Sequence, residues 1–194
     1  MRKEVKVIGL AYGQSQVGSY IVVLSEKKGK RKLPIVIKPS DAQQIALKIE
    51  GVKSPRPLTH DLFKSFTDVY KINVEEVYIY AILEGIFYTR IVTSVGFEEN
   101  EIECTAGDGI ALSIVYGCPL YVNDEVLDVS GVKVNEDGSE IVDDDIQDAE
   151  IIETTNRIVS IEDLERMMKE AIVNEEYEIA AELRDKISEL RGEM

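Results

Sequence analysis

One stretch of the sequence contains almost only acidic charges, and it divides the chain into three parts. Residues 135–159 include nine Asp and Glu but a single Arg. Like charges at this density repel one another and keep a segment extended, so we expect a solvated linker here. The chain then consists of a larger module at residues 1–134, the acidic linker at 135–159 and a short module at 160–194.

The acidity is confined to the linker and the short module. The formal net charge is -15, yet residues 1–134 contain 16 basic and 17 acidic side chains. Binding to a phosphate backbone relies on Lys and Arg, so a uniformly acidic chain would be a poor nucleic-acid binder. This argument does not apply to the larger module, because that module is nearly neutral.

The composition excludes several classes of protein. One histidine and two cysteines are too few for a multi-His metal site, a four-Cys zinc site or a disulfide framework. A carboxylate site for Mg²⁺ or Mn²⁺ stays open. The N-terminus has no apolar run typical of a signal peptide, and no segment reaches the roughly 18 apolar residues of a membrane span. We therefore predict a reduced, cytoplasmic protein.

Strand and helix patterns mix irregularly in the larger module. Glu84-Gly85 is typical of a hairpin turn. Runs rich in β-branched residues predict strands around Val5 and Val7 and at 20–24, 33–37, 77–83, 86–93 and 119–122, and a short strand is expected at 102–104. With helices between them, this pattern predicts an α+β fold, a mixed β-sheet packed with short helices.

Three helix starts are expected in this module. Ser40, Thr59 and Asp108 can each cap a short helix. Ser40-Asp41-Ala42 and Gly107-Asp108-Gly109 both place an acid where the helix dipole favours it. The second helix has an apolar face, made of Leu62, Phe63, Phe66, Val69 and Tyr70.

Residues 50–62 form the stretch most suited to chemistry. Two prolines stiffen the loop around Arg56, whose guanidinium can hold a phosphate through two hydrogen bonds. His60 follows at a helix start and can act as a general acid or base. Glu50 or Asp61 can orient the imidazole, and Glu50 or Asp108 can bind a divalent ion. The predicted catalytic residues are thus His60, Arg56, Asp61 and Glu50.

A structural explanation of the same residues stays open. Thr59 and Asp61 can serve only as helix caps, with His60 hydrogen-bonded to backbone. A turn rich in basic residues has two explanations as well, since it can grip phosphates or simply improve solubility. The residues expected to bind nucleic acid there are Lys27, Lys28, Lys30, Arg31 and Lys32.

The C-terminal module shows two apolar seams at helical spacing. Ser160 and Asp163 open the first helix, and Asn174-Glu175 falls at a turn before the second. We expect an antiparallel α-helical hairpin that either packs on its own core or docks a protein partner. The residues expected to contact such a partner are Leu164, Met168, Leu183 and Ile187.

Two resemblances narrow the function. The run Ala180-Ala181-x-Leu183-Arg184-Asp185-x-Ile187 resembles the UVR motif of bacterial excision-repair and protease-associated proteins, which implies protein–protein contact. The segment 56–62, Arg-Pro-Leu-Thr-His-Asp-Leu, resembles the bifunctional nuclease domain family, and the match extends over roughly residues 3–128. That second resemblance implies DNase and RNase activity and a dimeric or larger assembly.

One departure from that family pattern affects the expected activity. Members of the family usually have Arg-x-Ser-Asp-Ala where this chain has Thr105-Ala106-Gly107-Asp108-Gly109. If the missing Arg normally holds phosphate, cleavage here is weak or lost, and the glycines loosen the helix start. Two hypotheses follow. The first is a nuclease that hydrolyses phosphodiester bonds of DNA or RNA and is tethered to a docking hairpin. The alternative is a non-catalytic oligomeric adaptor that docks a repair or proteolysis partner through the UVR-like hairpin.

Overall fold

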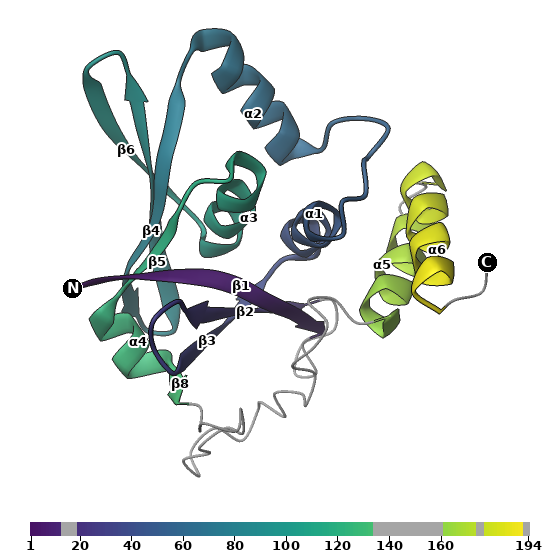
Figure 1. Ribbon diagram of the computed structural model, residues 1–194, viewed down its shortest axis with the longest axis horizontal. Coiled ribbons are helices and arrows are strands. Elements are labelled where there is room, and N and C mark those ends of the chain that lie inside the picture. The colour runs from purple at the N-terminus through teal and green to yellow at the C-terminus, as the bar shows by residue number, and fades with distance from the viewer. Residues whose placement is uncertain (13–18, 134–160, 174–176, 192–194) are drawn as a thin grey trace.

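The computed structural model describes residues 1–12, 19–133, 161–173 and 177–191. These residues form an eight-stranded sheet in the order β6-β5-β4-β7-β1-β2-β3-β8 (Figure 1). The β4–β7 pair is parallel and the other neighbouring pairs are antiparallel. The α+β prediction with a mixed sheet is therefore confirmed.

A strand lies at each of the predicted runs, although β7 begins at Leu120, one residue later than predicted. Their bounds are β1 Arg2–Tyr12, β2 Tyr20–Glu26, β3 Arg31–Ile37, β4 Asn73–Leu83, β5 Ile86–Val95, β6 Glu98–Cys104, β7 Leu120–Asn123 and β8 Val132–Lys133. The β4–β5 turn at Glu84 and Gly85 has positive φ angles of 51° and 77°. This geometry matches the twist of a two-residue hairpin, as the sequence predicts.

Four helices accompany the sheet in the larger module, and two follow the linker. Their bounds are α1 Pro39–Ile49, α2 Thr59–Tyr70, α3 Ala106–Tyr116, α4 Asp124–Ser130, α5 Ile161–Val173 and α6 Tyr177–Arg191. α3 packs on β4 and β5, and α1 and α2 both pack against α3. The core between these helices and the sheet is closed by fully buried side chains such as Tyr20, Leu33, Ile45, Ile79 and Ile110.

The helix caps differ from the sequence prediction. α1 begins at Pro39, whose fixed φ suits the first helical position, so Lys38 and not Ser40 is its N-cap. In α2 the Asp61 carboxylate accepts a hydrogen bond from the backbone N–H of Leu58, at 3.3 Å. Thr105 caps α3, because its hydroxyl accepts from the backbone N–H of Asp108. The N-caps, Lys38, Leu58 and Thr105, therefore lie one to three residues before the predicted Ser40, Thr59 and Asp108.

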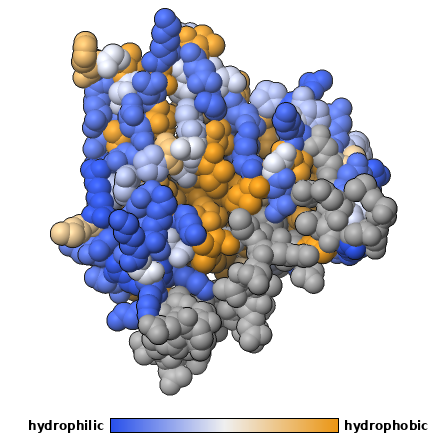
Figure 2. Space-filling view, in the orientation of Figure 1, coloured by the Kyte–Doolittle hydropathy of each residue, from blue (hydrophilic) through white to orange (hydrophobic). Residues whose placement is uncertain are grey.

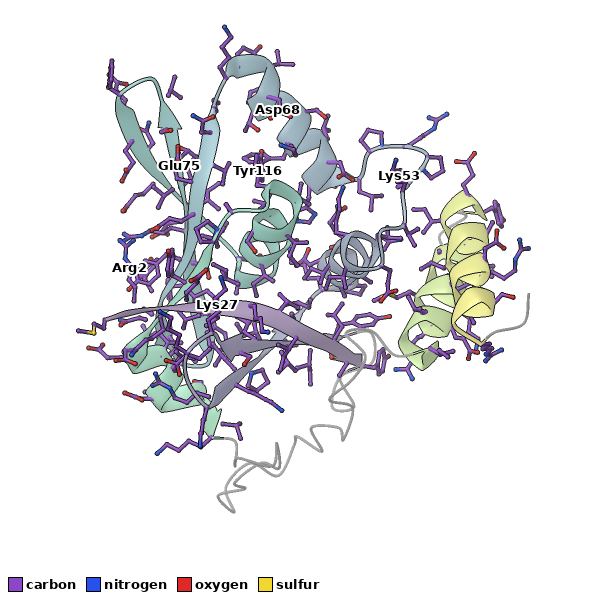
Figure 3. The ribbon with its side chains drawn as sticks, viewed as in Figure 1. Arg2, Lys27, Lys53, Asp68, Glu75 and Tyr116 are labelled. Carbon is purple, nitrogen blue, oxygen red and sulfur yellow. The ribbon has the colours of Figure 1, made fainter. Side chains whose placement is uncertain are left out.

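α2 contacts the rest of the chain through a narrow face. Phe63 meets Tyr116 of α3 edge to face at 6.5 Å, and Thr67 is hydrogen-bonded to the same tyrosine. Asp68 on α2 and Tyr116 mark this region in Figure 3. The remaining apolar residues of the helix are exposed, namely Leu62, Phe66, Val69 and Tyr70. Apolar atoms accordingly reach the surface near α2 (Figure 2).

α5 and α6 lie side by side (Figure 1). Their buried apolar residues join the main hydrophobic cluster, and the Arg166 guanidinium lies 3.6 Å from the ring centre of Tyr12 on β1. The predicted turn at 174–176 and the predicted linker fall outside the described residues, so the hairpin and the linker stay predictions. Within the described ranges, no helix has the length and apolar character needed to cross a membrane.

Candidate active site

Three side chains from three helices meet at one point, and we call Asp41, His60 and Asp108 the Asp–His–Asp cluster. One ligand-type atom from each of them lies within 4.8 Å of the others. His60 Nε2 is 3.4 Å from Asp108 Oδ1. Asp41 belongs to α1, His60 to α2 and Asp108 to α3, and all three lie in the first turn of their helix. The sheet and the helix contacts therefore bring three helix N-termini together.

Asp108 has several partners that stabilise its charge. The Thr105 hydroxyl donates to its Oδ2 at 2.5 Å, and Lys38 Nζ lies 3.5 Å from the same oxygen. Partial burial works to raise the pKa of Asp108, but the Thr105 hydrogen bond, Lys38 and His60 together outweigh burial, so the pKa lies below its ordinary value. Asp108 is thus ionised at neutral pH.

Asp41 is in a less favourable position. Only 1% of the residue is exposed. Its Oδ1 accepts from the Ser40 hydroxyl at 3.1 Å, whereas among the described residues its Oδ2 has no hydrogen-bond partner. Burial raises the pKa of Asp41, and the nearby negative charge of Asp108 adds to the rise. A buried carboxylate oxygen without a partner is costly, so it indicates a position that accepts a ligand.

Glycine allows Asp41 to occupy this position. A Cβ at Gly107 would lie 2.2 Å from Asp41 Oδ2. A Cβ at Gly109 would lie 2.8 Å from Thr89 Cγ2 on β5. The two glycines that the sequence interprets as loosening the start of α3 therefore permit close packing, against the carboxylate and against the sheet.

A cavity of about 430 Å³, which we call the cluster cavity, adjoins the Asp–His–Asp cluster. Lys38, Asp41, Thr105 and Gly107 line the side that belongs to the cluster. Lys38 Nζ is 4.0 Å from Asp41 Oδ2, and 59% of the Lys38 side chain is exposed. A ligand in the cavity would meet one cation, a buried carboxylate and the start of α3.

The other predicted catalytic acids lie elsewhere. Asp61 follows His60, but its carboxylate faces Lys48 Nζ at 2.7 Å and Gln44 Nε2 at 3.4 Å. Glu50 follows the last residue of α1, about 14 Å along the helix from Asp41. Neither residue belongs to the cluster.

Arg56 is exposed in the loop before α2, and Ser54 Oγ donates to its carbonyl at 2.6 Å. The loop lines a second cavity, of about 470 Å³, together with Tyr177 and Glu178 of α6. No contact between described residues joins Arg56 to the Asp–His–Asp cluster.

The basic turn is partly neutralised by acids of the same module. Arg31 forms ion pairs with Glu26, Asp124 and Asp128 at 2.6–3.1 Å. Lys27 pairs with Glu4 of β1. Lys28 and Lys30 are exposed and Lys32 is half-buried. Ion pairs with carboxylates reduce the positive charge that Lys27 and Arg31 would offer to a phosphate.

The predicted partner-binding residues are largely covered within the chain. Leu164, Leu183 and Ile187 are buried, and Met168 is half-buried. Among the described side chains of α5 and α6, the large apolar ones that are exposed are Ile172, Val173 and Tyr177.

Two residues of the site, Asp41 and Lys38, were not among the sequence predictions. A signal for Asp41 existed, since the acids at 41 and 108 occupy matching places at two helix starts. Lys38 lacks such a signal, because its proximity to Asp108 arises from the packing of α1 against α3.

Comparisons with known proteins show the family of this chain. The family model of the bifunctional nuclease domain matches residues 22–135, and that of the UvrB/uvrC motif matches residues 159–193. An uncharacterized protein of Mycobacterium tuberculosis is 35% identical over 138 residues, which are 71% of this chain and 81% of the relative. Bifunctional nuclease 1 of Oryza sativa subsp. japonica is 25% identical over 181 residues, 89% of this chain and 55% of the plant protein. The chain, with a UVR motif at its C-terminus, therefore belongs to the bifunctional nuclease domain family.

Proposed function

We propose that the chain is a nuclease that hydrolyses phosphodiester bonds at the Asp–His–Asp cluster with the help of a divalent ion. The observation that carries this proposal is the meeting of two carboxylates and an imidazole beside a cavity at three helix N-termini. Helix N-termini favour anions, and Lys38 adds a cation at the same place. Family membership agrees with this function, and we propose cytoplasmic action on DNA or RNA.

The residues present fit a divalent ion. Asp41 Oδ2 is buried without a hydrogen-bond partner in the described part of the chain, as expected of a ligand atom awaiting a cation. Carboxylate oxygens suit Mg²⁺ or Mn²⁺, and an imidazole nitrogen adds an affinity for transition ions, so the mixed set favours Mn²⁺. Asp41, His60 and Asp108 would hold the ion, which would lower the pKa of a bound water and offset phosphate charge.

The chain's own residues prepare the cluster for this role. Thr105 fixes the Asp108 carboxylate through its hydroxyl, at 2.5 Å. Lys38 is close enough to both acids to bind a phosphate oxygen beside them. The glycine at 107 keeps the path to Asp41 free of a side chain.

Cleavage of labelled RNA and DNA tests the proposal. We expect Asp41→Asn, Asp108→Asn and His60→Ala each to lower the rate by at least about 100-fold, because each change removes a ligand of the ion that activates the attacking water. Asp68→Asn, an exposed acid paired with Lys64 on α2, should retain the wild-type rate. EDTA should abolish cleavage and Mn²⁺ should restore it. Full activity in EDTA would contradict the ion, and wild-type rates in all three variants would contradict the site.

An adaptor function is the second candidate, and the matched UVR motif favours it. We propose that the C-terminal helices form a docking hairpin, joined to the nuclease module 1–134 by the acidic linker. The exposed Ile172, Val173 and Tyr177 would contact the partner, since Leu164, Leu183 and Ile187 are buried. Capture of a partner by wild type but not by Ile172→Asp/Val173→Asp would support docking. Equal capture by Leu83→Asp, an exposed control on β4, is expected.

A further inference from the structure

We propose that the cluster cavity binds one unpaired nucleotide of a single-stranded nucleic acid. The phosphate would lie at Lys38 and the start of α3, and the base would lie against Val36 and Ile86. This inference rests on the proposed nuclease function and adds its substrate class: single-stranded over double-stranded nucleic acid.

The first argument is size. The cavity volume of about 430 Å³ falls within the range of roughly 300–1,000 Å³ typical of small-ligand sites. A cavity of this kind accepts one nucleotide but not a base pair. In a duplex each base is stacked and paired, and taking it out of the stack costs a few kcal/mol. A single strand avoids this cost.

The second argument is the apolar wall. Val36 and Ile86 line the cavity although 62% and 61% of each residue is exposed. Phe87, half-buried, lines the same cavity. Apolar and aromatic side chains left uncovered beside a cavity offer a surface against which an unpaired base can pack.

The third argument is the anion-binding side. Lys38 Nζ is 3.5 Å from Asp108 and lines the cavity. Ala106 and Gly107, the first residues of α3, line it as well, and the backbone N–H groups of a first helical turn have no partner inside the helix. A ligand with a ring and a phosphate can contact both the apolar wall and the anion-binding side of the cavity. A nucleotide has a ring and a phosphate.

Binding can be measured without cleavage. Fluorescence anisotropy of the full chain in EDTA would use a labelled 8-nucleotide phosphorothioate strand, as DNA and as RNA, and the matching duplexes. We expect the single strand to bind at least fivefold tighter than its duplex. Ile86→Ser and Lys38→Ala should each weaken single-strand binding about three- to tenfold, the loss of part of one stacking or phosphate contact.

Two matched controls make this test specific. Leu83→Ser changes a residue that pairs with Ile86 across the β4–β5 turn and is equally exposed, but is outside the cavity lining. Lys6→Ala changes an exposed lysine that lines a different cavity, near the C-terminal ends of α1 and α3. Both should bind within twofold of wild type.

Equal affinity for single strand and duplex would overturn the inference, and so would Ile86→Ser binding no worse than Leu83→Ser. A different result would refute the proposed nuclease function, namely that wild type with Mn²⁺ does not cleave nucleic acid. Single-strand preference without cleavage would support the cavity and refute the nuclease.

Discussion

Lys38 holds its ammonium group against both carboxylates of the Asp–His–Asp cluster, 3.5 Å from Asp108 and 4.0 Å from Asp41. Its side chain is more than half exposed, so it can move into the cavity without disturbing the core. A divalent ion bound by the same carboxylates would repel it. The residue therefore links ion binding to phosphate binding.

Replacing Lys38 by alanine should strengthen ion binding while weakening nucleic-acid binding. An exposed ion pair contributes about 0.2–1 kcal/mol, so Mn²⁺ affinity should rise by roughly one- to fivefold. Isothermal titration with Mn²⁺ measures this directly, and Lys6→Ala should match wild type. Weaker Mn²⁺ binding by Lys38→Ala would refute the idea that Lys38 and the ion compete for the same carboxylates.

We expect the buried Asp41 carboxylate to lower the free energy of unfolding in a pH-dependent way. Because burial raises its pKa in the folded state, the folded protein binds this proton more tightly than the unfolded chain. The free energy of unfolding should then fall as the pH rises from about 4 through the raised pKa. In EDTA, Asp41→Asn should be more stable than wild type at pH 7, by on the order of 1–3 kcal/mol, and should lose this advantage below about pH 4.

Urea unfolding of both proteins across pH 3–8, with EDTA present, checks the sign. Asp68→Asn is the matched control, because its carboxylate is exposed and, among the described residues, forms an ion pair only with Lys64, at 3.4 Å. If wild type were more stable than Asp41→Asn at pH 7, the buried carboxylate would not lower the stability of the folded protein.

Sequence reasoning identified His60 and Asp108 but not Asp41. The first two stand out because a lone histidine and an acid follow helix starts. Asp61 fits the same pattern equally well, yet its carboxylate faces Lys48. Which acid faces the histidine depends on the packing of α1 and α2 against α3, and no local pattern contains that information.

At the scale of elements, the start of α3 determines the geometry of the site. Gly107 and Gly109 occupy the first turn, one facing Asp41 and the other facing the sheet. Substitutions at Gly107 and at Gly109 can therefore separate the effect of packing against α1 from the effect of packing against β5.

Gly107→Ala should reduce Mn²⁺ affinity, because the added methyl group would displace the Asp41 carboxylate. We expect at least a tenfold loss, together with a stability loss of about 1–3 kcal/mol from overpacking. Gly109→Ala should lose comparable stability, since its methyl group would meet Thr89 and Val77, while the folded protein keeps its Mn²⁺ affinity. Titration calorimetry and urea unfolding of both variants separate the two effects. Equal Mn²⁺ affinity in both would contradict this role of Gly107.

The elements themselves were more predictable than their ends. Runs rich in β-branched residues and the Glu84-Gly85 turn determine strands such as β4 and β5 locally. The predicted caps Ser40 and Asp108 are wrong because α1 already begins at Pro39 and Thr105 already caps α3. Two short elements, α4 and β8, were missed, since α4 has seven residues and β8 only two, too few for a periodic signal.

At the scale of the whole molecule, α2 presents an exposed apolar face of Leu62, Phe66, Val69 and Tyr70. Large exposed apolar faces favour association. The family resemblance implied a dimer or larger assembly, and this face is where we expect two copies to meet.

Phe66→Glu should therefore convert a dimer to a monomer, because a charge at such an interface would be buried without a partner. Light scattering coupled to size exclusion measures the mass. Val129→Glu, at an exposed apolar position of α4, should leave the assembly unchanged. A monomeric wild type, or a Phe66→Glu variant that stays dimeric, would contradict this expectation.

The meeting of three helix N-termini has a thermodynamic consequence. The three cluster residues come from helices far apart in the sequence, so the unfolded chain has no comparable site. An ion that binds only the folded state stabilises it by mass action, by about 1.4 kcal/mol for each tenfold rise in its free concentration above the dissociation constant. Without the ion, repulsion between the Asp41 and Asp108 carboxylates lowers the stability of the fold. A bound ion would attract both carboxylates, so the abundance of folded protein would follow the ion supply.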